Sequence, residues 1–181
     1  MELAELRAQL EEFHTASFGW ALSCCRQNYA EAEEVLQTVY LKILQGKARY
    51  DGGSKLQTWL FAVIRNTAIS ERRKNLLRSI SVAPLENKVG AQSQIELERS
   101  EMQRRFQEAL QSLPTRQRET LHLVFYQELT LSEAAEVMRI SIGSARQHYE
   151  RGKKRLRELL DREEVDYGIG WRRKENPGTV L

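Results

Sequence analysis

The sequence contains few of the residues on which disulfides and metal sites depend. It has 2 cysteines and 3 histidines in 181 residues. Cys24 and Cys25 are adjacent, which disfavours a disulfide between them, and no C-x-x-C or histidine spacing suggests a metal site. We predict that both are small core residues, with a redox-sensing thiol pair as the alternative. No cofactor and no metal are expected.

Long hydrophobic runs are also missing, which excludes a membrane-spanning helix. The first residues, Met1-Glu-Leu-Ala-Glu-Leu-Arg7, are amphipathic and acidic. A secretory signal peptide would instead have a basic start, an apolar stretch and a cleavage site with small residues. We therefore expect a cytoplasmic protein.

The sequence has no strong excess of charge of one sign. Its 28 lysines and arginines nearly balance its 25 aspartates and glutamates, so the formal net charge is +3 and the pI is near 8.9. A protein that coats nucleic acid by global electrostatic attraction would be more basic. Any nucleic-acid site must therefore be a local basic surface.

Signatures of common enzyme classes are absent as well. There is no glycine-rich phosphate loop, no serine elbow and no His-Glu-x-x-His helix. His14, His122 and His148 are scattered and form no obvious site. We expect a protein that is not an enzyme.

What is present is helical periodicity in two blocks, without internal repeats or strand-like alternation. Helix is predicted from Leu3 to about Lys74, interrupted only between Gly46 and Ser54, and again from about Ile95. The fold class is therefore all-α, with two small helical domains joined by a flexible linker, the C-terminal one a helix-turn-helix. The predicted segments are a first domain at 1–75, a linker at 76–94, a second domain at 95–162 and a disordered tail at 163–181.

The helix-turn-helix is predicted from two capped helices. Thr130 and Glu133 have the spacing of a capping box, and Ser141 can cap the following helix. Apolar residues at helical spacing are expected to pack in the core. In the first helix these are Leu131, Ala134, Ala135 and Met138, and in the second they are Ile142, Ala145, Tyr149, Leu156 and Leu159.

A third helix completes this small core. Leu113-Pro114 predicts a proline in its first turn, and Leu121, Val124 and Phe125 form a stripe that we expect to be buried. A basic face on an isolated helical hairpin would more often be a solvated surface. The three-helix context instead favours a helix that enters the major groove of DNA.

Two helices of the N-terminal block carry opposite charges. In the first, Ala32, Leu36, Val39 and Ile43 are expected to be buried, which leaves an acidic face outward. The next helix is basic on one face, and its expected core residues are Leu56, Leu60, Val63 and Thr67. Trp59 borders that stripe and is interpreted as structural.

The order and spacing of these features resemble those of extracytoplasmic-function (group IV) sigma factors, subunits that direct bacterial RNA polymerase to promoters. Ala30-Glu-Ala-Glu-Glu-Val-Leu-Gln37 resembles an acidic signature of the family, and Trp59-Leu-Phe-Ala-Val-Ile-Arg-Asn66 resembles its tryptophan-to-asparagine signature. The resemblance extends from Leu22 to Leu160. It implies core RNA polymerase, promoter DNA and an anti-sigma factor as partners.

The resemblance also implies residue roles. Polymerase binding falls to Glu31, Glu34 and Gln37. Contact with minus-ten DNA, including capture of a flipped base by the loop with Asn66 behind it, falls to Tyr50, Asp51, Gly52, Ser54, Lys55, Arg65, Asn66, Arg72 and Arg73. Duplex contact at the minus-thirty-five element falls to Ser144, Arg146, Gln147, Glu150, Arg151, Lys154 and Arg155. Arg146 suits guanine and Gln147 suits adenine, whereas the basic residues further along suit phosphate.

Alternatives remain for three features. A conventional helix-turn-helix regulator would bind duplex DNA without polymerase, usually as a dimer on a palindrome, and would need neither the acidic helix nor the base-capture loop. Arg72 and Arg73 could form a solvated helix end, where cations interact favourably with the helix dipole. Trp171 in the tail could belong to a docking motif.

Overall fold

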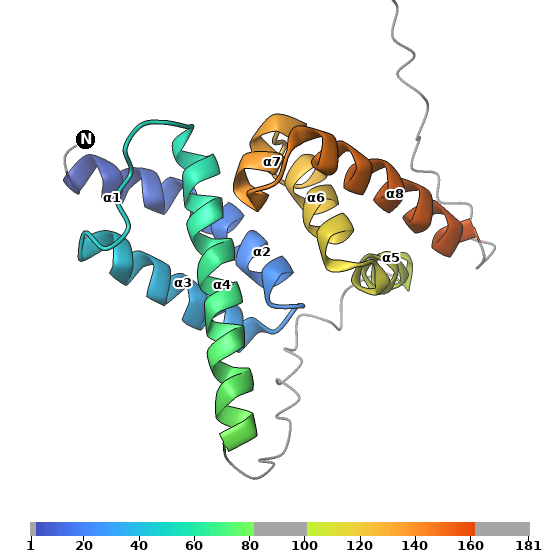
Figure 1. The fold of residues 1–181 in the computed structure, drawn as a ribbon, viewed down its shortest axis with the longest axis horizontal. Helices are drawn as coiled ribbons and strands as arrows, with labels where there is room; N and C mark the ends of the chain where they lie inside the picture. Colours follow the sequence, from blue (N-terminus) through green and yellow to red (C-terminus); the bar gives the residue numbers. More distant parts are fainter. Residues whose placement is uncertain (1–2, 82–100, 162–181) are drawn as a thin grey trace, which may run out of the picture.

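The computed structural model describes residues 3–81 and 101–161, and every regular element in these two ranges is an α-helix (Figure 1). The N-terminal block comprises α1 (Leu3–Glu12), α2 (His14–Cys24), α3 (Tyr29–Leu44) and α4 (Leu56–Ser81). The C-terminal block comprises α5 (Glu101–Ser112), α6 (Thr115–Phe125), α7 (Leu131–Met138) and α8 (Ile142–Asp161). The all-α prediction is confirmed.

The N-terminal block has more breaks than the sequence predicted. Besides the loop before α4, the chain turns between α1 and α2 and between α2 and α3. Arg26 and Gln27 adopt positive φ values of 54° and 66° in the second of these turns. No glycine or proline marks that turn. Residues other than glycine seldom adopt positive φ values, so the sequence did not indicate a break there. Asn28 then caps α3 by accepting a hydrogen bond from the backbone N–H of Glu31 at 3.1 Å.

The last N-terminal helix is longer than predicted. Helix α4 continues to Ser81, past the expected end at Lys74 and through the first residues assigned to the linker. The expected helix start near Ile95 and the tail at 163–181 lie outside the described residues.

The expected core stripe of α3 is confirmed in full, since all four of its residues are buried. The stripe of α4 was predicted less well. Leu60 and Thr67 are buried, but Leu56 and Val63 are only half-buried. Helix α4 packs against α2 and α3 on one side and against α7 on another, so its buried surface is wider than one stripe. The additional buried residues are Thr58, Phe61, Ile64, Arg65 and Ala68.

Local signals in the C-terminal block were largely correct. Thr130 and Glu133 form the predicted capping box at α7, and Ser141 Oγ accepts a hydrogen bond from the backbone N–H of Ser144 at 3.1 Å. Pro114 occupies the N-cap position of α6, one residue before the predicted first turn.

Two predicted core residues of this block are instead exposed. Phe125 is the last residue of α6 and is 41% exposed, with its ring stacked on Tyr149 at the protein surface. Ile142 is the first residue of α8 and is 50% exposed. Both lie at helix ends, where the chain leaves the packed region. Helical periodicity therefore overestimated their burial.

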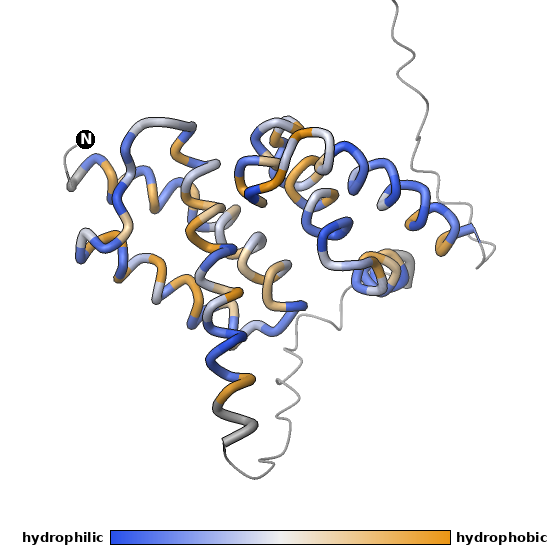
Figure 2. Tube along the Cα trace, in the orientation of Figure 1, coloured by the Kyte–Doolittle hydropathy of each residue, from blue (hydrophilic) through white to orange (hydrophobic). Residues whose placement is uncertain are grey.

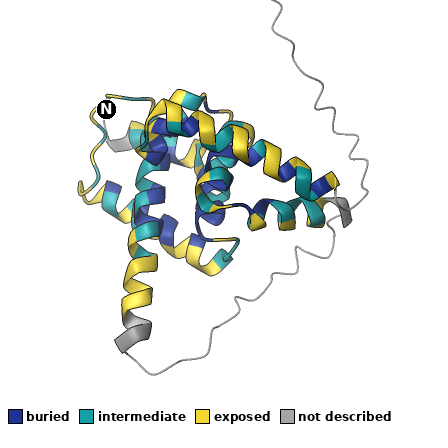
Figure 3. Cartoon of the chain, turned by 45° about the vertical axis from the view of Figure 1, so that its right-hand side comes forward, coloured by how far each residue is buried: buried dark blue, intermediate teal, exposed yellow. Residues whose placement is uncertain are grey.

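The two blocks share one hydrophobic core. Its largest cluster includes Trp20, Phe61 and Ile64 from the N-terminal block together with Leu123, Val137 and Met138 from α6 and α7. A smaller cluster joins α5, α6 and α8 through Leu110, Leu113, Leu121, Leu156 and Leu160. Figure 3 shows many of the buried residues where the blocks meet, while α4 is exposed over residues 72–77. The blocks thus pack together as one body in this structure.

The two cysteines lie in this core as free thiols, as the sequence predicted. Burial raises the pKa of Cys24 well above its ordinary value and that of Cys25 to about 11. Both side chains are therefore in the unreactive thiol form at neutral pH. Separately, none of the helices in the described ranges is long and apolar enough to cross a membrane.

Candidate nucleic-acid interface

Helix α8, which the sequence predicts to enter the major groove, is positioned by a short turn with a defined backbone. Helix α7 ends at Arg139, whose φ of 53° and ψ of 51° place it in the left-handed region. The chain reverses there and α8 begins after Ser141. Close packing of α7 and α8 is possible because Ala134, Ala135 and Ala145 are small and buried. This geometry leaves one long face of α8 open to solvent.

The residues predicted to contact the minus-thirty-five element lie on that open face. Ser144 is half-buried and the others are exposed: Arg146, Gln147, Glu150, Arg151, Lys154 and Arg155. In Figure 2, α8 is hydrophilic along most of its length. The helix has 20 residues and is therefore about 30 Å long.

Close neighbours already pair with two cations of α8. Lys153 Nζ lies 3.0 Å from a Glu150 carboxylate oxygen and 4.4 Å from the centre of the Tyr149 ring. Arg155 lies 3.3 Å from Glu158. Such exposed pairs within a helix are worth only a few tenths of a kcal/mol. Pairs this weak leave both side chains able to exchange partners.

The loop predicted to capture a base is organised by its own side chains. Tyr50 donates a hydrogen bond to the carbonyl of Ser54, and its ring lies 5.4 Å from that of Trp59. Asp51 accepts from the backbone N–H of Gly53 at 3.0 Å, and Gly52 has a φ of 79°. Trp59 packs against the core, which confirms its structural interpretation.

Three cations assigned to the same site form contacts within the protein. Arg72 donates to the backbone carbonyl of Cys24. Lys55 Nζ lies 2.6 Å from a carboxylate oxygen of Glu133, although the Lys55 side chain is 74% exposed. Arg65 is only 8% exposed and faces Glu119 of α6. The structure therefore keeps Lys55 at the exposed loop. It places Arg65 inside the interface between the blocks, away from solvent.

Glu119 is a residue that sequence reasoning missed. Its Oε2 accepts hydrogen bonds from Arg65 Nε at 3.2 Å and from Arg65 Nη2 at 3.1 Å. Arg65 Nη1 also reaches the backbone carbonyl of Met138 at 3.5 Å. Residues 65 and 119 are far apart in the sequence, so no local pattern could connect them.

Glu133 was predicted only as a cap, and it also contacts the other block. Hydrogen bonds from Lys55 and from the side chain and backbone of Thr130 lower its pKa from 4.5 to about 2. The carboxylate is therefore charged throughout the physiological range. One side chain both starts α7 and joins it to the loop before α4.

The predicted polymerase-binding residues form an exposed row on α3. Glu31, Glu34 and Gln37 are all exposed, on the side of the helix opposite its buried stripe. They lie on a different element from the residues predicted to contact the minus-thirty-five element, which are on α8. The structure therefore presents separate acidic and basic faces.

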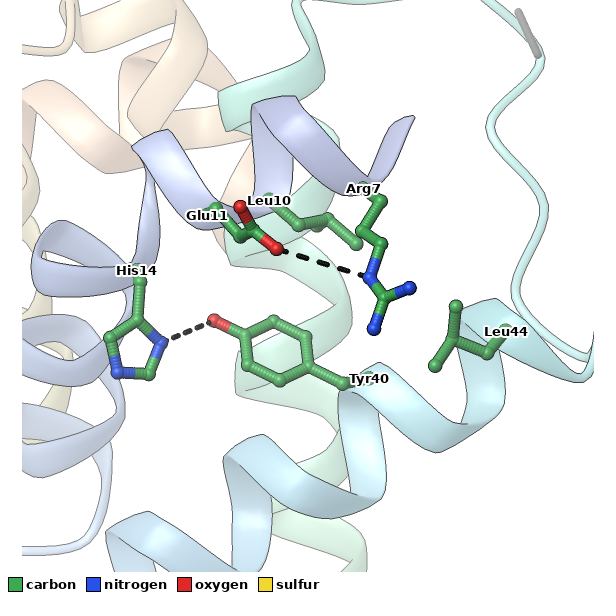
Figure 4. A pocket seen from close by; sticks show the side chains of 6 residues that line it. All are labelled: Arg7, Leu10, Glu11, His14, Tyr40 and Leu44. Atoms are coloured by element: carbon green, nitrogen blue, oxygen red, sulfur yellow. Dashed lines mark hydrogen bonds and ion pairs between the residues drawn. The ribbon is translucent and has the colours of Figure 1, made fainter. Parts of the chain in front are cut away.

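A shallow pocket between α1, α2 and α3 contains none of the predicted site residues (Figure 4). It is lined by Arg7, Leu10, Glu11, His14, Tyr40 and Leu44. His14 Nδ1 and Tyr40 Oη are 3.0 Å apart at its edge. Within the described ranges, no group of three acidic, histidine or cysteine side chains could hold a metal ion.

Two family models match the chain. Residues 10–77 match sigma-70 region 2, and residues 109–158 match sigma-70 region 4. The first covers the N-terminal block as far as α4, and the second covers the helix-turn-helix.

Curated relatives and solved structures agree with these matches. The RNA polymerase sigma factor CarQ of Myxococcus xanthus is 27% identical over 77% of this chain and 80% of its own length. The ECF RNA polymerase sigma factor SigM of Bacillus subtilis is 30% identical over 72% of this chain and 80% of its own length.

Among solved structures, the sigma factor RpoE in complex with the anti-sigma factor NepR from Bartonella quintana superposes with a TM-score of 0.70 and 26% identity. That match covers 91% of this chain and 99% of that one. The structure of CnrH in complex with the cytosolic domain of CnrY shares the fold, with a TM-score of 0.58 and 19% identity over 86% of this chain and 88% of that one. With both sigma-70 regions in order and relatives matched over most of their length, the chain belongs to the extracytoplasmic-function family of RNA polymerase sigma factors.

Proposed function

We propose that this sigma factor directs promoter-specific initiation through three surfaces: the acidic face of α3, the loop before α4 and the open face of α8. Family membership supports a role in RNA polymerase-dependent transcription. The assignment of a separate task to each surface is inferred from the geometry.

Recognition of duplex DNA at the minus-thirty-five element is assigned to α8. The order of side chains along the open face of this helix is the observation that supports the proposal most strongly. The helix begins with short polar side chains at a capped N-terminus and continues with cations on the same open face. That order places base-reading groups ahead of phosphate-binding groups, as in helix-turn-helix proteins that read the major groove. Arg146 and Gln147 are exposed near the start of the helix, where base edges would lie.

Capture of a minus-ten base is assigned to the loop at 50–55, with Asn66 behind it and Arg72 and Arg73 further along α4. A flipped base needs polar groups for its Watson–Crick edge, a surface to receive it and nearby positive charge for the phosphates. The loop supplies backbone groups that Gly52 and Gly53 leave accessible, the Tyr50 ring beside them, and the Lys55 ammonium.

Binding of core RNA polymerase is assigned to Glu31, Glu34 and Gln37, which would pair with basic residues of that enzyme. An anti-sigma factor is a further proposed partner, because a similar sigma factor was solved in complex with one. We also propose that the first domain extends through α4 to Ser81, past the boundary at 75, and that the second corresponds to α5–α8.

The test is reconstituted transcription. Purified protein is combined with core RNA polymerase and a promoter library, and start sites are mapped by sequencing against a reaction without the protein. We expect discrete starts preceded by two conserved motifs at fixed spacing. Tight binding to duplex DNA by the protein alone, without specific starts, would favour a conventional regulator.

A further inference from the structure

One histidine lies within a row of side chains that α8 would present to duplex DNA. His148 stands four residues after Ser144 and three residues before Arg151. Arg155 follows four residues further on. Steps of three and four residues return to the same face of a helix, so these side chains form a single row about 16 Å long. His148 is therefore flanked on both sides by residues that the proposed function assigns to the minus-thirty-five element.

A second helix brings positive charge to the same place. Helix α6 packs along α8, and a Cβ atom at Gly152 would lie 3.3 Å from Gln117 Cβ (Figure 1). Gly152 is one helical turn beyond His148, and Arg116 directly precedes Gln117. The Arg116 side chain is exposed, whereas His148 is half-buried. The surface around the imidazole thus draws on two helices.

The imidazole of His148 faces more positive than negative charge. Partial burial lowers its pKa below the ordinary value of 6.5. The charges of Arg116 and Arg151 lower this pKa further, while the negative charge of Glu119 opposes them. Glu119 is already hydrogen-bonded to Arg65, and no charge of α5 or α7 within the described residues belongs to this set. The neutral imidazole is therefore the main form in the free chain at neutral pH.

A backbone phosphate of DNA would reverse this balance. A negative charge within about 4–6 Å favours the charged form of an imidazole and raises its pKa. The protonated ring also has two N–H donors for phosphate oxygens, whereas the neutral ring has one. A group whose pKa rises on binding takes up a proton, so binding becomes tighter as the pH falls. An arginine at this position would remain charged, and its contribution would not change with pH.

We propose that His148 contacts a backbone phosphate of the upstream DNA element and that its protonation makes promoter binding pH-dependent. This inference rests on the proposed function, because it takes the role of α8 at the minus-thirty-five element as given. Phosphate contacts carry no sequence information. His148 therefore sets the strength of promoter binding and leaves the choice of bases to Arg146 and Gln147.

The test uses holoenzyme assembled from the full chain and core polymerase, on a promoter fragment recovered by start-site mapping. Fluorescence anisotropy gives dissociation constants from about pH 8 to about pH 6 at constant ionic strength. The wild type is compared with His148→Gln, His148→Arg and His14→Gln. His14 is the control because it lies on α2, in the other block. Dividing each affinity by that of His148→Gln at the same pH removes any pH dependence of polymerase itself.

We expect the wild-type affinity, relative to that of His148→Gln, to rise by about threefold or more between these two pH values. The rise should stay below about tenfold per pH unit, because this site takes up at most one proton. His14→Gln should follow the wild type. His148→Arg should bind at least as tightly as the wild type does at the lowest pH, and its ratio to His148→Gln should be the same throughout.

A shorter promoter fragment, cut so that it lacks the minus-thirty-five element, tests where His148 acts. The pH-dependent difference between the wild type and His148→Gln should disappear on it, because α8 then has no phosphate to contact. A constant ratio on the full fragment, or a difference that persists on the short one, would overturn the proposal. If specific starts are found but the ratio is constant, only this inference fails. If no protein gives specific starts, the proposed function fails and this inference fails with it.

Discussion

Trp20 of α2 lies against His122 of α6, with ring centroids 5.3 Å apart, and this contact joins the N-terminal block to the C-terminal block. His122 also stacks on Tyr126 and lies 3.1 Å from the side-chain nitrogen of Gln127. Burial lowers its pKa from 6.5 to about 4. A neutral imidazole is therefore part of the surface that holds the blocks together.

The first prediction is a loss of stability in mild acid. Between pH 6.5 and pH 4 the unfolded chain binds a proton at His122 that the folded chain does not. The free energy of unfolding should therefore decrease as the pH falls through this range, by at most about 3 kcal/mol from this group. Urea denaturation at a series of pH values measures the change.

The matched variant for this prediction is His122→Phe, which keeps a ring against Trp20 but cannot titrate. Its stability should depend less on pH than that of the wild type between 6.5 and 4.5. The low pKa of Glu133 affects stability only below its ordinary value of 4.5, so that range separates the two groups. Equal slopes for the two proteins would contradict a lowered pKa of His122 in the folded chain.

The second prediction concerns Gly152 of α8, which packs against Leu121 and Gln117 of α6. A Cβ atom there would lie 3.1 Å from Leu121 Cδ1 and 3.3 Å from Gln117 Cβ. Leu121 is 1% exposed and has little room to move. Gly152→Ala should destabilise the protein by about 1 kcal/mol, since overpacking outweighs the gain in helix propensity.

Gly143→Ala is the control on the same helix. The nearest atom to a Cβ at Gly143 is Ser141 Oγ at 3.9 Å, an ordinary contact. This variant should be neutral or stabilised by a few tenths of a kcal/mol. Urea midpoints of the two variants and the wild type are compared, and a Gly152→Ala protein as stable as Gly143→Ala would show that α6 and α8 are less tightly packed than described.

The third prediction addresses polymerase binding. Glu34→Arg reverses a charge on the exposed row of α3 and should weaken binding to core polymerase about tenfold or more, because a favourable pairing becomes repulsion. Glu33→Arg makes the same change at an exposed position one residue earlier, which points about 100° away around the helix. Binding is measured by fluorescence anisotropy, and circular dichroism checks the fold. Equal affinities for both variants would remove Glu34 from the proposed surface.

The fourth prediction concerns promoter reading by α8. Arg146→Ala should relax preference at one base pair of the upstream element and cost about 1–3 kcal/mol at the preferred base. Arg157→Ala, further along the exposed side of the helix, should weaken binding about uniformly across sequences. Transcription from a library of all single-base variants distinguishes the two patterns. An unchanged profile for Arg146→Ala would show that this residue does not read a base.

Local features of this protein followed from the sequence because their causes are local. The capping box of Thr130 and Glu133 and the Ser141 cap depend on spacings of three residues, so the pattern was sufficient. The α3 stripe was read correctly because only one side of that helix is buried. Phe125 and Ile142 were read wrongly because periodicity does not show where a helix leaves the packed region.

By itself, then, the sequence determined an all-α chain with a capped helix-turn-helix, an acidic helix and a resemblance to a sigma-factor family. The tertiary structure decided how the two blocks meet. Arg65 was predicted to contact minus-ten DNA, and in this structure it is buried and pairs with Glu119, a residue with no role in the sequence-based prediction. Pairing of charges far apart in the chain depends on the packing of whole helices, because burial makes the partner necessary and only the folded arrangement supplies it.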